Sequence, residues 1–391
     1  MGNFLNKILL YKESTVDTIP SNPKCFSIKT ESIGLTGQES SEVNNELGNG
    51  RGASAKAFGA SDISGDMGMI WNTDNAPILL THAIGDATST ANATSDSWAG
   101  TTVYAKGDLV NHTDGLHTLV CYTAGTSGAT EPDLSSHTTA NAGRNTRTPS
   151  DGSVVWLIMP KLYEQSGERG ECLTSFGVEV KDDITCGSSD PEYCRYGGLR
   201  ISSLPFNITG DTNAVKSSAS LIGLSEEDSL IVTDEGGTYQ AMSAKSGFTE
   251  VEVISDYYLL GDCTFNLDGV EAPMKTTSFD ATINNNASAD KALNKKKIDN
   301  IGLVNIDGSF AIVMDTTTYV EAARHVDKAA KFVFAKANGC LMELEFPQLK
   351  LEKTYKEFST DKTTMLTIPF SAFDTSDSKS VKWRTISPIS Y

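Results

Sequence analysis

One pattern occurs twice in the chain, at a constant offset of 243 positions, and it constrains the fold more than any other feature. Residues 58–71 read FGASDISGDMGMIW and residues 301–314 read IGLVNIDGSFAIVM. The matched positions are Gly59 with Gly302, Asp62 with Asn305, Ile63 with Ile306, Gly65 with Gly308 and Met67 with Phe310. Self-similarity at a fixed offset predicts that one supersecondary unit is used twice.

Each copy is predicted to run as strand, turn and strand. The turns are placed at Ser64-Gly65 and at Asp307-Gly308, because glycine after a small polar residue is typical of turns. After the turn, apolar residues alternate with others, at Met67, Met69 and Trp71 in the first copy and at Phe310, Ile312 and Met314 in the second. Alternation puts these side chains on one face and indicates a half-buried strand.

A helix is predicted after each copy. The first spans Ala76–Gly85, with Asp74 or Asn75 as its N-cap, and the second spans Thr318–Ala335, with Thr316 or Thr317 as its N-cap. In the second, residues with helical spacing are Tyr319, Ala322, Ala323, Val326, Ala329, Ala330 and Val333.

Further strands are expected in both halves. They are Leu199–Thr209 and Ala219–Gly223 in the first half, and Leu341–Leu351 and Met365–Phe373 in the second. A hairpin of Thr264–Leu267 and Ala272–Asn284, turning at Asp268-Gly269, is expected between them. The predicted class is mainly β (α+β): two β-β-α-β-β halves merged into one sandwich or barrel with flanking helices.

The length of 391 residues suggests more than one domain. Residues 1–97 and 161–391 are interpreted as one discontinuous domain. Between them, after the low-complexity run TSTANATSDS at 88–97, residues 98–160 follow a different pattern and are interpreted as a small inserted β-domain. Its two ends are expected to meet at a surface loop, so that its removal is expected to leave assembly intact.

Charge, cysteine content and apolar runs limit what the chain can bind and where it is made. The net charge is −18, which disfavours tight binding of nucleic acid, because such binding needs cations against phosphates. Seven cysteines without a CxxC pair are expected to be free thiols. With no secretory signal and no apolar run long enough to span a membrane, the chain is expected to be made in the cytoplasm without a membrane anchor.

The sequence contains none of the common catalytic or metal-binding motifs. The five histidines, His82, His112, His117, His137 and His325, are scattered and form no HExxH motif, and no GxSxG or P-loop occurs. Acidic runs such as Asp182-Asp183 and Glu226-Glu227-Asp228 are typical of solvated loops. No enzyme activity and no cofactor are predicted.

The order of elements resembles the major tail tube proteins of long-tailed, siphovirus-like phages. The segments that carry the resemblance are SSEVNNELGNGR within 39–51, the ISGDM segment with its strand and helix, LRISSLPFNITGDTNAVKSSASLIG at 199–223, SFDATINNN at 278–286, and the second copy with its helix at 301–335. The resemblance implies hexameric rings of identical subunits that stack into a tube. The implied partners are further copies of the chain, tape measure and tail terminator proteins, and genomic DNA that passes the lumen without tight binding.

Residues 98–160 resemble the small β-domains related to chitin-type carbohydrate-binding modules. The resemblance rests on the spaced pattern W…Y..GD.V…Y.AGTSG..EP…DGSV.W, and a compact three-stranded unit is expected. Sugars stack on exposed aromatic rings, which makes Trp98, Tyr104, Tyr122 and Trp156 the candidate glycan-binding residues. The alternative is that these rings form the small core, because so short a unit has little else to bury.

One basic cluster stands out in an acidic chain. Residues 291–297 read KALNKKK, and Lys291, Lys295, Lys296 and Lys297 are candidates for contact with an acidic face of a neighbouring ring. The alternative is a solvated loop, as most charge runs are.

Two further functions remain open beside the tail tube. The chain could be a carbohydrate-binding adhesion protein whose active part is residues 98–160 and whose partners are host surface glycans. It could also be a tail terminator or a decoration protein of the virion. In all phage readings the protein is located in the virion after assembly in the host cytoplasm.

Overall fold

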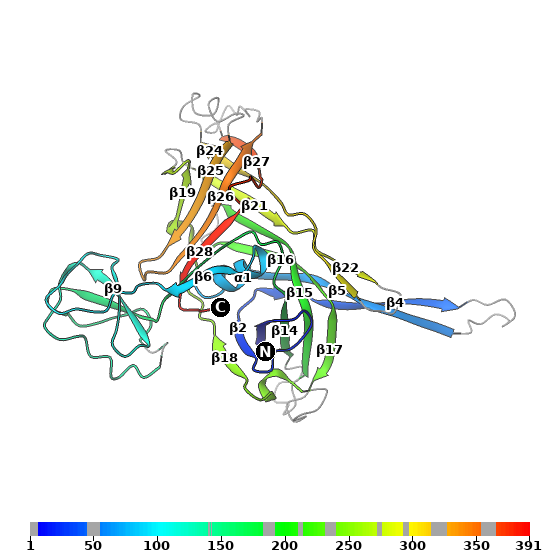
Figure 1. Cartoon of the computed structure of the whole chain (residues 1–391), viewed down its shortest axis with the longest axis horizontal. Helices are drawn as coiled ribbons and strands as arrows, with labels where there is room; N and C mark the ends of the chain where they lie inside the picture. Colours follow the sequence, from blue (N-terminus) through cyan, green and yellow to red (C-terminus); the bar gives the residue numbers. More distant parts are fainter. Residues whose placement is uncertain are drawn as a thin grey trace, which may run out of the picture.

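The protein is described by a computed structural model over residues 7–44, 55–139, 141, 143–182, 192–209, 214–230, 240–271, 276–291, 297–313, 327–352 and 365–391. Twenty strands of this part of the chain join in one hydrogen-bonded network, and the single α-helix found there, α1 (Ala76–Ala83), lies among them. Figure 1 shows the network as the central body of the molecule. The prediction of a mainly β chain is confirmed.

The strands of this body come from both sides of the 98–160 segment. Before it lie β1 (Lys7–Lys12), β2 (Lys24–Ile28), β3 (Ser32–Ile33), β4 (Thr36–Asn44), β5 (Ala55–Ile70) and β6 (Ala87–Asn92). After it lie β13 (Tyr163–Glu168), β14 (Phe176–Asp182), β15 (Glu192–Thr209), β16 (Lys216–Gly223), β17 (Ser225–Leu230), β18 (Thr249–Glu252), β19 (Cys263–Leu267), β20 (Val270–Glu271), β21 (Thr276–Asn284), β24 (Asn305–Val313), β25 (Asp327–Ala335), β26 (Leu341–Leu351), β27 (Met365–Ala372) and β28 (Lys382–Ser387). A separate hairpin consists of β22 (Ser288–Lys291) and β23 (Lys297–Asn300).

Strand β15 joins the two parts of the body. Its first half pairs with β14 and β17, and its second half pairs with β16 and β21. A register shift between Ile201 and Ser203 lies in its middle. Beyond it, Leu204, Phe206 and Ile208 are buried in alternation, which is why this stretch forms a strand with one face in the core.

The core of the second half is built from phenylalanines on five neighbouring strands. They are Phe279, Phe310, Phe332, Phe346 and Phe370, each at most 2% exposed. The ring of Phe279 lies 3.8 Å from that of Phe332 and 5.7 Å from that of Phe370, measured between centroids. Burial of each such ring stabilises the fold by about 2–3 kcal/mol.

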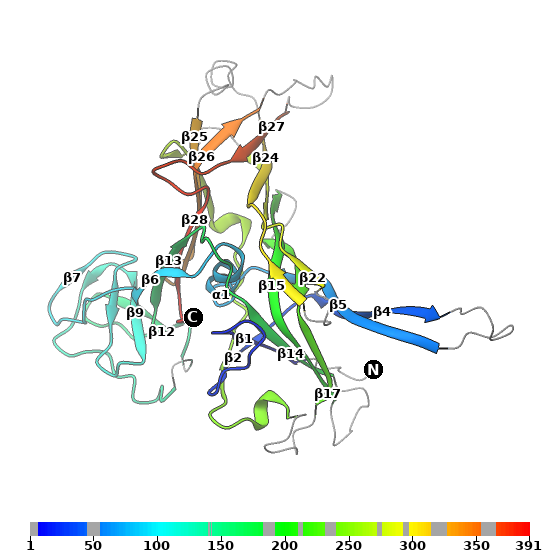
Figure 2. The ribbon, with the colours of Figure 1, turned by 45° about the vertical axis from the view of Figure 1, so that its right-hand side comes forward.

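Helix α1 is enclosed by the body, as Figure 2 shows. All eight of its residues are buried, which matches a helix that is apolar on every side. The predicted helix at Ala76–Gly85 is confirmed, with its end at Ala83. The N-cap is Asn75, one of the two predicted residues, but its side chain makes no capping hydrogen bond. The Asn72 side chain instead accepts hydrogen bonds from the backbone N–H groups of Asp74 and Asn75.

The two predicted turns of the repeat are wrong. Strand β5 runs without a break through Ser64-Gly65, and β24 does so through Asp307-Gly308. Both glycines instead allow a neighbouring backbone to come close. A Cβ on Gly65 would lie 2.2 Å from the carbonyl oxygen of Gly34, and one on Gly308 would lie 2.1 Å from that of Asp280. The predicted alternation is confirmed at Met67, Met69 and Trp71, which are all buried.

The second predicted helix is wrong over its last part. Residues 327–335 form strand β25, where Ala330, Phe332 and Phe334 are buried in alternation. The spacing of Ala329, Ala330 and Val333 is compatible with a helix. The segment forms a strand because it pairs with β19 on one edge and with β26 on the other. The earlier part, residues 318–326, lies outside the described residues.

The predicted hairpin turn at Asp268-Gly269 is confirmed, with positive φ angles of 53° and 76°. Its second arm is the short strand β20, which pairs with β19. The expected second arm, in the form of β21, pairs with β15 and β24 instead. The predicted strand Leu341–Leu351 coincides with β26, and Met365–Phe373 coincides with β27 to within one residue.

Residues 98–160 form sheets of their own, seen apart from the body in Figure 1. The strands are β7 (Val103–Tyr104), β8 (Leu109–Asn111), β9 (His117–Thr123), β10 (Gly125–Thr126), β11 (Thr146–Arg147) and β12 (Val155–Pro160). They form a four-stranded sheet, β11-β12-β9-β8, and a two-stranded sheet, β10-β7, in place of the expected three-stranded unit. The ends of the segment do meet, because β6 pairs with β13 and Asn92 lies opposite Tyr163.

Candidate functional site

A two-stranded ribbon is the first candidate surface for assembly. Strands β4 and β5 pair from Thr36 opposite Ser64 to Asn44 opposite Ala55. On its other edge β5 pairs with β16 only from Ile63 to Ile70, so the outer part of the ribbon has no third strand among the described residues. Figure 1 shows it extending from the body. An isolated two-stranded ribbon is marginally stable in water, and this one is therefore suited to packing on another chain.

An open sheet edge is the second candidate surface. Strand β6 is hydrogen-bonded to β13 on one side, and within the described chain no strand pairs with its other side. Five of its six side chains, from Thr88 to Asn92, are exposed. Its sequence, ATSTAN, contains no charge and no proline, which are the residues that usually protect an edge strand from pairing.

Two lysines of the predicted basic cluster lie in strands β22 and β23. Lys291 is the last residue of β22 and lies opposite Lys297, the first residue of β23. Lys295 and Lys296 lie outside the described residues.

The four aromatic residues predicted to bind glycans do not form one exposed surface. Trp156 is fully buried and Tyr104 is 7% exposed, and their rings pack edge to face with centroids 4.8 Å apart. Trp98 packs partly buried against the same core cluster. Tyr122 lies apart from these three, and the Arg147 guanidinium covers it at 3.8 Å from the ring centroid. Trp156 and Tyr104 therefore have no free face on which a sugar could stack.

A single carboxylate holds two of these aromatic residues. Asp151 Oδ2 accepts hydrogen bonds from the indole N–H groups of Trp98, at 2.9 Å, and Trp156, at 2.8 Å. Its Oδ1 accepts the backbone N–H of Gly128 at 2.7 Å. Asp151 is 8% exposed, so these bonds form in a largely water-free setting. Its role was not found from the sequence, where the DGSV segment indicates only a turn.

A shallow pocket of about 460 Å³ lies on the 98–160 segment beside this cluster. It is lined by the 128–137 loop, which includes Glu131 and His137, and by residues 146–152, which include Arg147. The pocket combines polar and apolar groups, but the rings of Trp98, Tyr104, Tyr122 and Trp156 do not line it.

The histidines lie in two kinds of setting. His82, within α1, is buried between the carbonyl oxygen of Thr174 at 3.0 Å and the hydroxyl of Tyr391 at 2.5 Å. Burial lowers the pKa of His82 to about 3, so it is neutral and structural. His325, its counterpart at the repeat offset, lies outside the described residues.

Two other histidines share one carboxylate. The Nδ1 atom of His117 lies 2.6 Å from Asp114 Oδ2, and Nδ1 of His112 lies 3.1 Å from the same oxygen. Burial alone would raise the pKa of Asp114, but hydrogen bonds from His117 and from backbone amides lower this pKa to about 2. The sequence spacing of these residues did not reveal this contact. In the described part of the chain, no group of three or more His, Cys, Asp or Glu residues is placed to hold a metal ion.

Neither the cysteines nor the helices of the described residues indicate a further site. Cys25, Cys121, Cys172, Cys263 and Cys340 are free thiols, and Cys186 lies outside the described residues. Among the helices that the structure describes, none has the length and apolar character needed to cross a bilayer.

Comparison with known proteins supplies the family. No curated protein matches the sequence. The sequence does match the family described as phage tail tube protein, over residues 4–372, so the match runs through both parts of the body and the segment between them. A chain of many paired strands with open edges, and with an extended ribbon, suits a subunit that is completed by neighbours. The chain belongs to the phage tail tube protein family and is a structural component of the virion tail.

Proposed function

We propose that copies of this chain close into six-membered rings, and that the rings stack into the tube that conducts genomic DNA during ejection. The observation that carries this proposal is the β4–β5 ribbon, which extends past its last contact with β16. A ribbon that the subunit does not support needs a surface on another copy. Identical copies joined by unlike surfaces generate rings and stacks.

The open edge of β6 supports ring closure. It leaves backbone donors and acceptors on one side that a neighbouring strand could pair with, and it lacks the charges that would oppose such pairing. In a closed ring every subunit has a neighbour, so no such edge stays unpaired.

The charge of the chain supports conduction without adhesion. A net charge of −18 on every subunit gives an assembled wall that repels phosphate, so DNA can slide through the lumen. Lys291, Lys295, Lys296 and Lys297 are the proposed contact with an acidic face of the next ring. Tape measure and tail terminator proteins are the proposed partners at the ends of the tube.

We further propose a discontinuous tube domain, residues 1–97 and 161–391, with residues 98–160 as an inserted domain. The separate sheets and the separate core cluster of this segment support the division. The duplication is proposed for β5 and β24, which are both inner strands with a close-approach glycine at the same repeat position. Glycan binding by the segment would depend on Trp98 and Tyr122, the two candidate rings that are not fully enclosed.

A substitution in the ribbon tests the proposal. Ala57 lies opposite Glu42 in the ribbon, and Ala57→Pro removes a backbone N–H donor and bends the strand beyond its pairing with β16. We expect Ala57→Pro subunits to fold, with an unchanged unfolding midpoint, and to form few or no tubes in negative-stain micrographs. Ala57→Ser, which keeps the backbone N–H, is the matched control and is expected to form tubes of normal length.

The opposite results would count against the proposal. If the purified wild-type chain stays a monomer at high concentration, the proposal of an assembled tube is wrong. If Ala57→Pro tubes are as abundant as wild-type tubes, the ribbon is not needed for contact with another copy. Six-fold symmetry in averaged end views of the wild-type tubes checks the number of subunits in a ring.

A further inference from the structure

The sheet of the 98–160 segment is covered on both faces. Along β9 and β12, successive side chains point to opposite faces. One set, Leu119, Cys121, Trp156 and Ile158, packs into the segment's own core. The other set, Val120, Leu157 and Met159, packs against Leu162 and Cys340 of the body. The body therefore covers a face that would otherwise expose apolar side chains to water.

The turn between β25 and β26 approaches this face closely. Gly339 lies in that turn with φ of +80°, and a Cβ at this position would lie 2.8 Å from Cδ2 of Leu109 and 3.3 Å from Cγ2 of Val120. The positive φ favours glycine here, and the missing side chain leaves room for Leu109 and Val120 of the segment.

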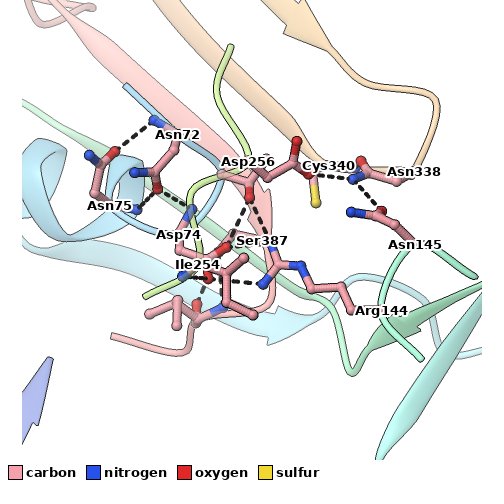
Figure 3. Close-up of polar contacts among 12 residues, drawn as sticks. Asn72, Asp74, Asn75, Arg144, Asn145, Ile254, Asp256, Asn338, Cys340 and Ser387 are labelled. Atoms are coloured by element: carbon pink, nitrogen blue, oxygen red, sulfur yellow. Dashed lines mark hydrogen bonds and ion pairs between the residues drawn. The ribbon is translucent and has the colours of Figure 1, made fainter. Parts of the chain in front are cut away.

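An ion pair crosses the same boundary, as Figure 3 shows. Arg144, from the segment, donates from its two terminal nitrogens to the two carboxylate oxygens of Asp74, at 3.0 and 2.7 Å. The side chains are 5% and 1% exposed, respectively. Arg144 also donates to the hydroxyl of Thr73 at 3.0 Å. This is a buried, two-pronged pair, the arrangement in which arginine binds carboxylate most specifically.

Asp74 connects the pair to two parts of the body. It lies two residues before α1, and its Oδ2 accepts the backbone N–H of Ile254 at 3.0 Å. Beside it, the amide nitrogen of Asn338 donates to Asn145 Oδ1 at 3.0 Å and to Asp256 Oδ2 at 2.7 Å. The start of α1, residues 254–256 and the β25–β26 turn therefore all meet the segment at one junction (Figure 3).

We propose that this junction fixes the 98–160 segment to the body as one cooperatively folding unit, with Arg144 as the positioning residue. A core of eight residues is too small to stabilise a unit of this size well by itself. The docked face supplies further burial, and Arg144 neutralises a carboxylate that would otherwise be buried without a cation. The segment then projects from every subunit at one angle, and does not swing on the strands that lead into it.

This inference changes the expectation for a chain without the segment. Removal of residues 98–160 would expose Cys340 and Leu162 and leave Asp74 buried without its arginine. Although the ends of the segment meet, we now expect the shortened chain to be less stable than the intact one.

Hydrogen exchange on the intact chain tests the proposal without any need for assembly. We expect amides of β9 and β12 to exchange in urea with the same midpoint as amides of β26 and α1, because segment and body open together. Arg144→Met should speed exchange by at least about tenfold in β9, β12 and residues 254–256, since it leaves Asp74 as a buried unpaired charge. The matched control is Arg147→Met: Arg147 lies over Tyr122 within the same segment, and its replacement should leave exchange at 254–256 unchanged.

Two further variants keep the test decisive if Arg144→Met fails to fold. Arg144→Lys keeps the charge but lacks the planar fork, and we expect an intermediate increase in exchange. Combining Asp74→Asn with Arg144→Met removes both charges and should restore much of the protection that the single change loses. A wild-type segment that opens at a clearly lower urea midpoint than the body, equal effects of Arg144→Met and Arg147→Met, or no recovery in the double variant would each overturn the proposal.

Discussion

The body and the 98–160 segment reach stability in different ways. The body buries one continuous core of aliphatic and aromatic side chains within its own strands, and it encloses α1 completely. The segment has eight core residues and depends on one carboxylate, Asp151, to hold two indoles, and on the body to cover its second face. The difference shows that a small β-unit can be distinct in its sheets and still depend on its host for stability.

The largest effect is expected in the body. Phe332 is 1% exposed and contacts Phe265, Phe279 and Phe346, so Phe332→Ala leaves a cavity among rings that cannot collapse into it. We expect the free energy of unfolding to fall by about 3–5 kcal/mol, measured by urea denaturation. Body and segment should lose protection together. Loss of protection in the segment alone would show that body and segment do not open together.

A smaller effect is expected in the segment. Asp151→Asn keeps the shape of the side chain but removes the charge and presents an amide N–H toward donors. We expect a loss of about 2–3 kcal/mol, because one or two charge-assisted hydrogen bonds are lost in a buried setting.

Urea denaturation followed by tryptophan fluorescence can measure this change, because the indoles of Trp98 and Trp156 lie at Asp151. The matched control is Asp108→Asn, a change at an exposed position of the same segment. If both substitutions shift the unfolding midpoint equally, the hydrogen bonds from the two indoles to Asp151 add no more stability than an exposed aspartate of the same segment.

The smallest effect is a dependence on pH that belongs to the body. The folded-state pKa of His82 is lowered to about 3, whereas an unfolded histidine titrates near 6.5, so the unfolded chain binds the proton more readily between these values. Stability from His82 is complete above pH 6.5 and is lost as the pH falls, by about 1–2 kcal/mol near pH 5.

Replacement of this histidine should flatten the curve. His82→Gln is expected to lower stability at pH 7 but to reduce its fall between pH 6.5 and 5, as measured by urea denaturation at several pH values. Identical slopes for wild type and His82→Gln would show that His82 is not buried in the neutral form.

Local sequence patterns predicted much of the strand framework. The alternation at 67–71 and at 341–351 was sufficient to predict strands, and the apolar run after Asn75 was sufficient to predict α1. Glycine signals were misleading at Gly65 and Gly308, because a glycine that permits a turn also permits close approach of another backbone. In β25 both periods were present, and pairing with two neighbouring strands decided between them.

The candidate sites were harder to predict from the sequence than the strands. The short length of the segment offered, as the alternative to glycan binding, that its aromatic rings form a small core, and Trp156 and Tyr104 do so. Nothing local could show which of the rings are enclosed or that Arg147 covers Tyr122. The same holds for Arg144 and Asp74, which are 70 positions apart and share no motif.

The sequence by itself determined a mainly β chain, a helix that begins at Ala76 and a segment with a pattern of its own, because these follow from periodicity and composition over neighbouring residues. Only the tertiary structure decided which edges stay open, which rings are buried and how the segment docks on the body. Those features depend on contacts between residues far apart in the chain, and the energy of a buried charge or an unpaired edge is set by what lies against it in space.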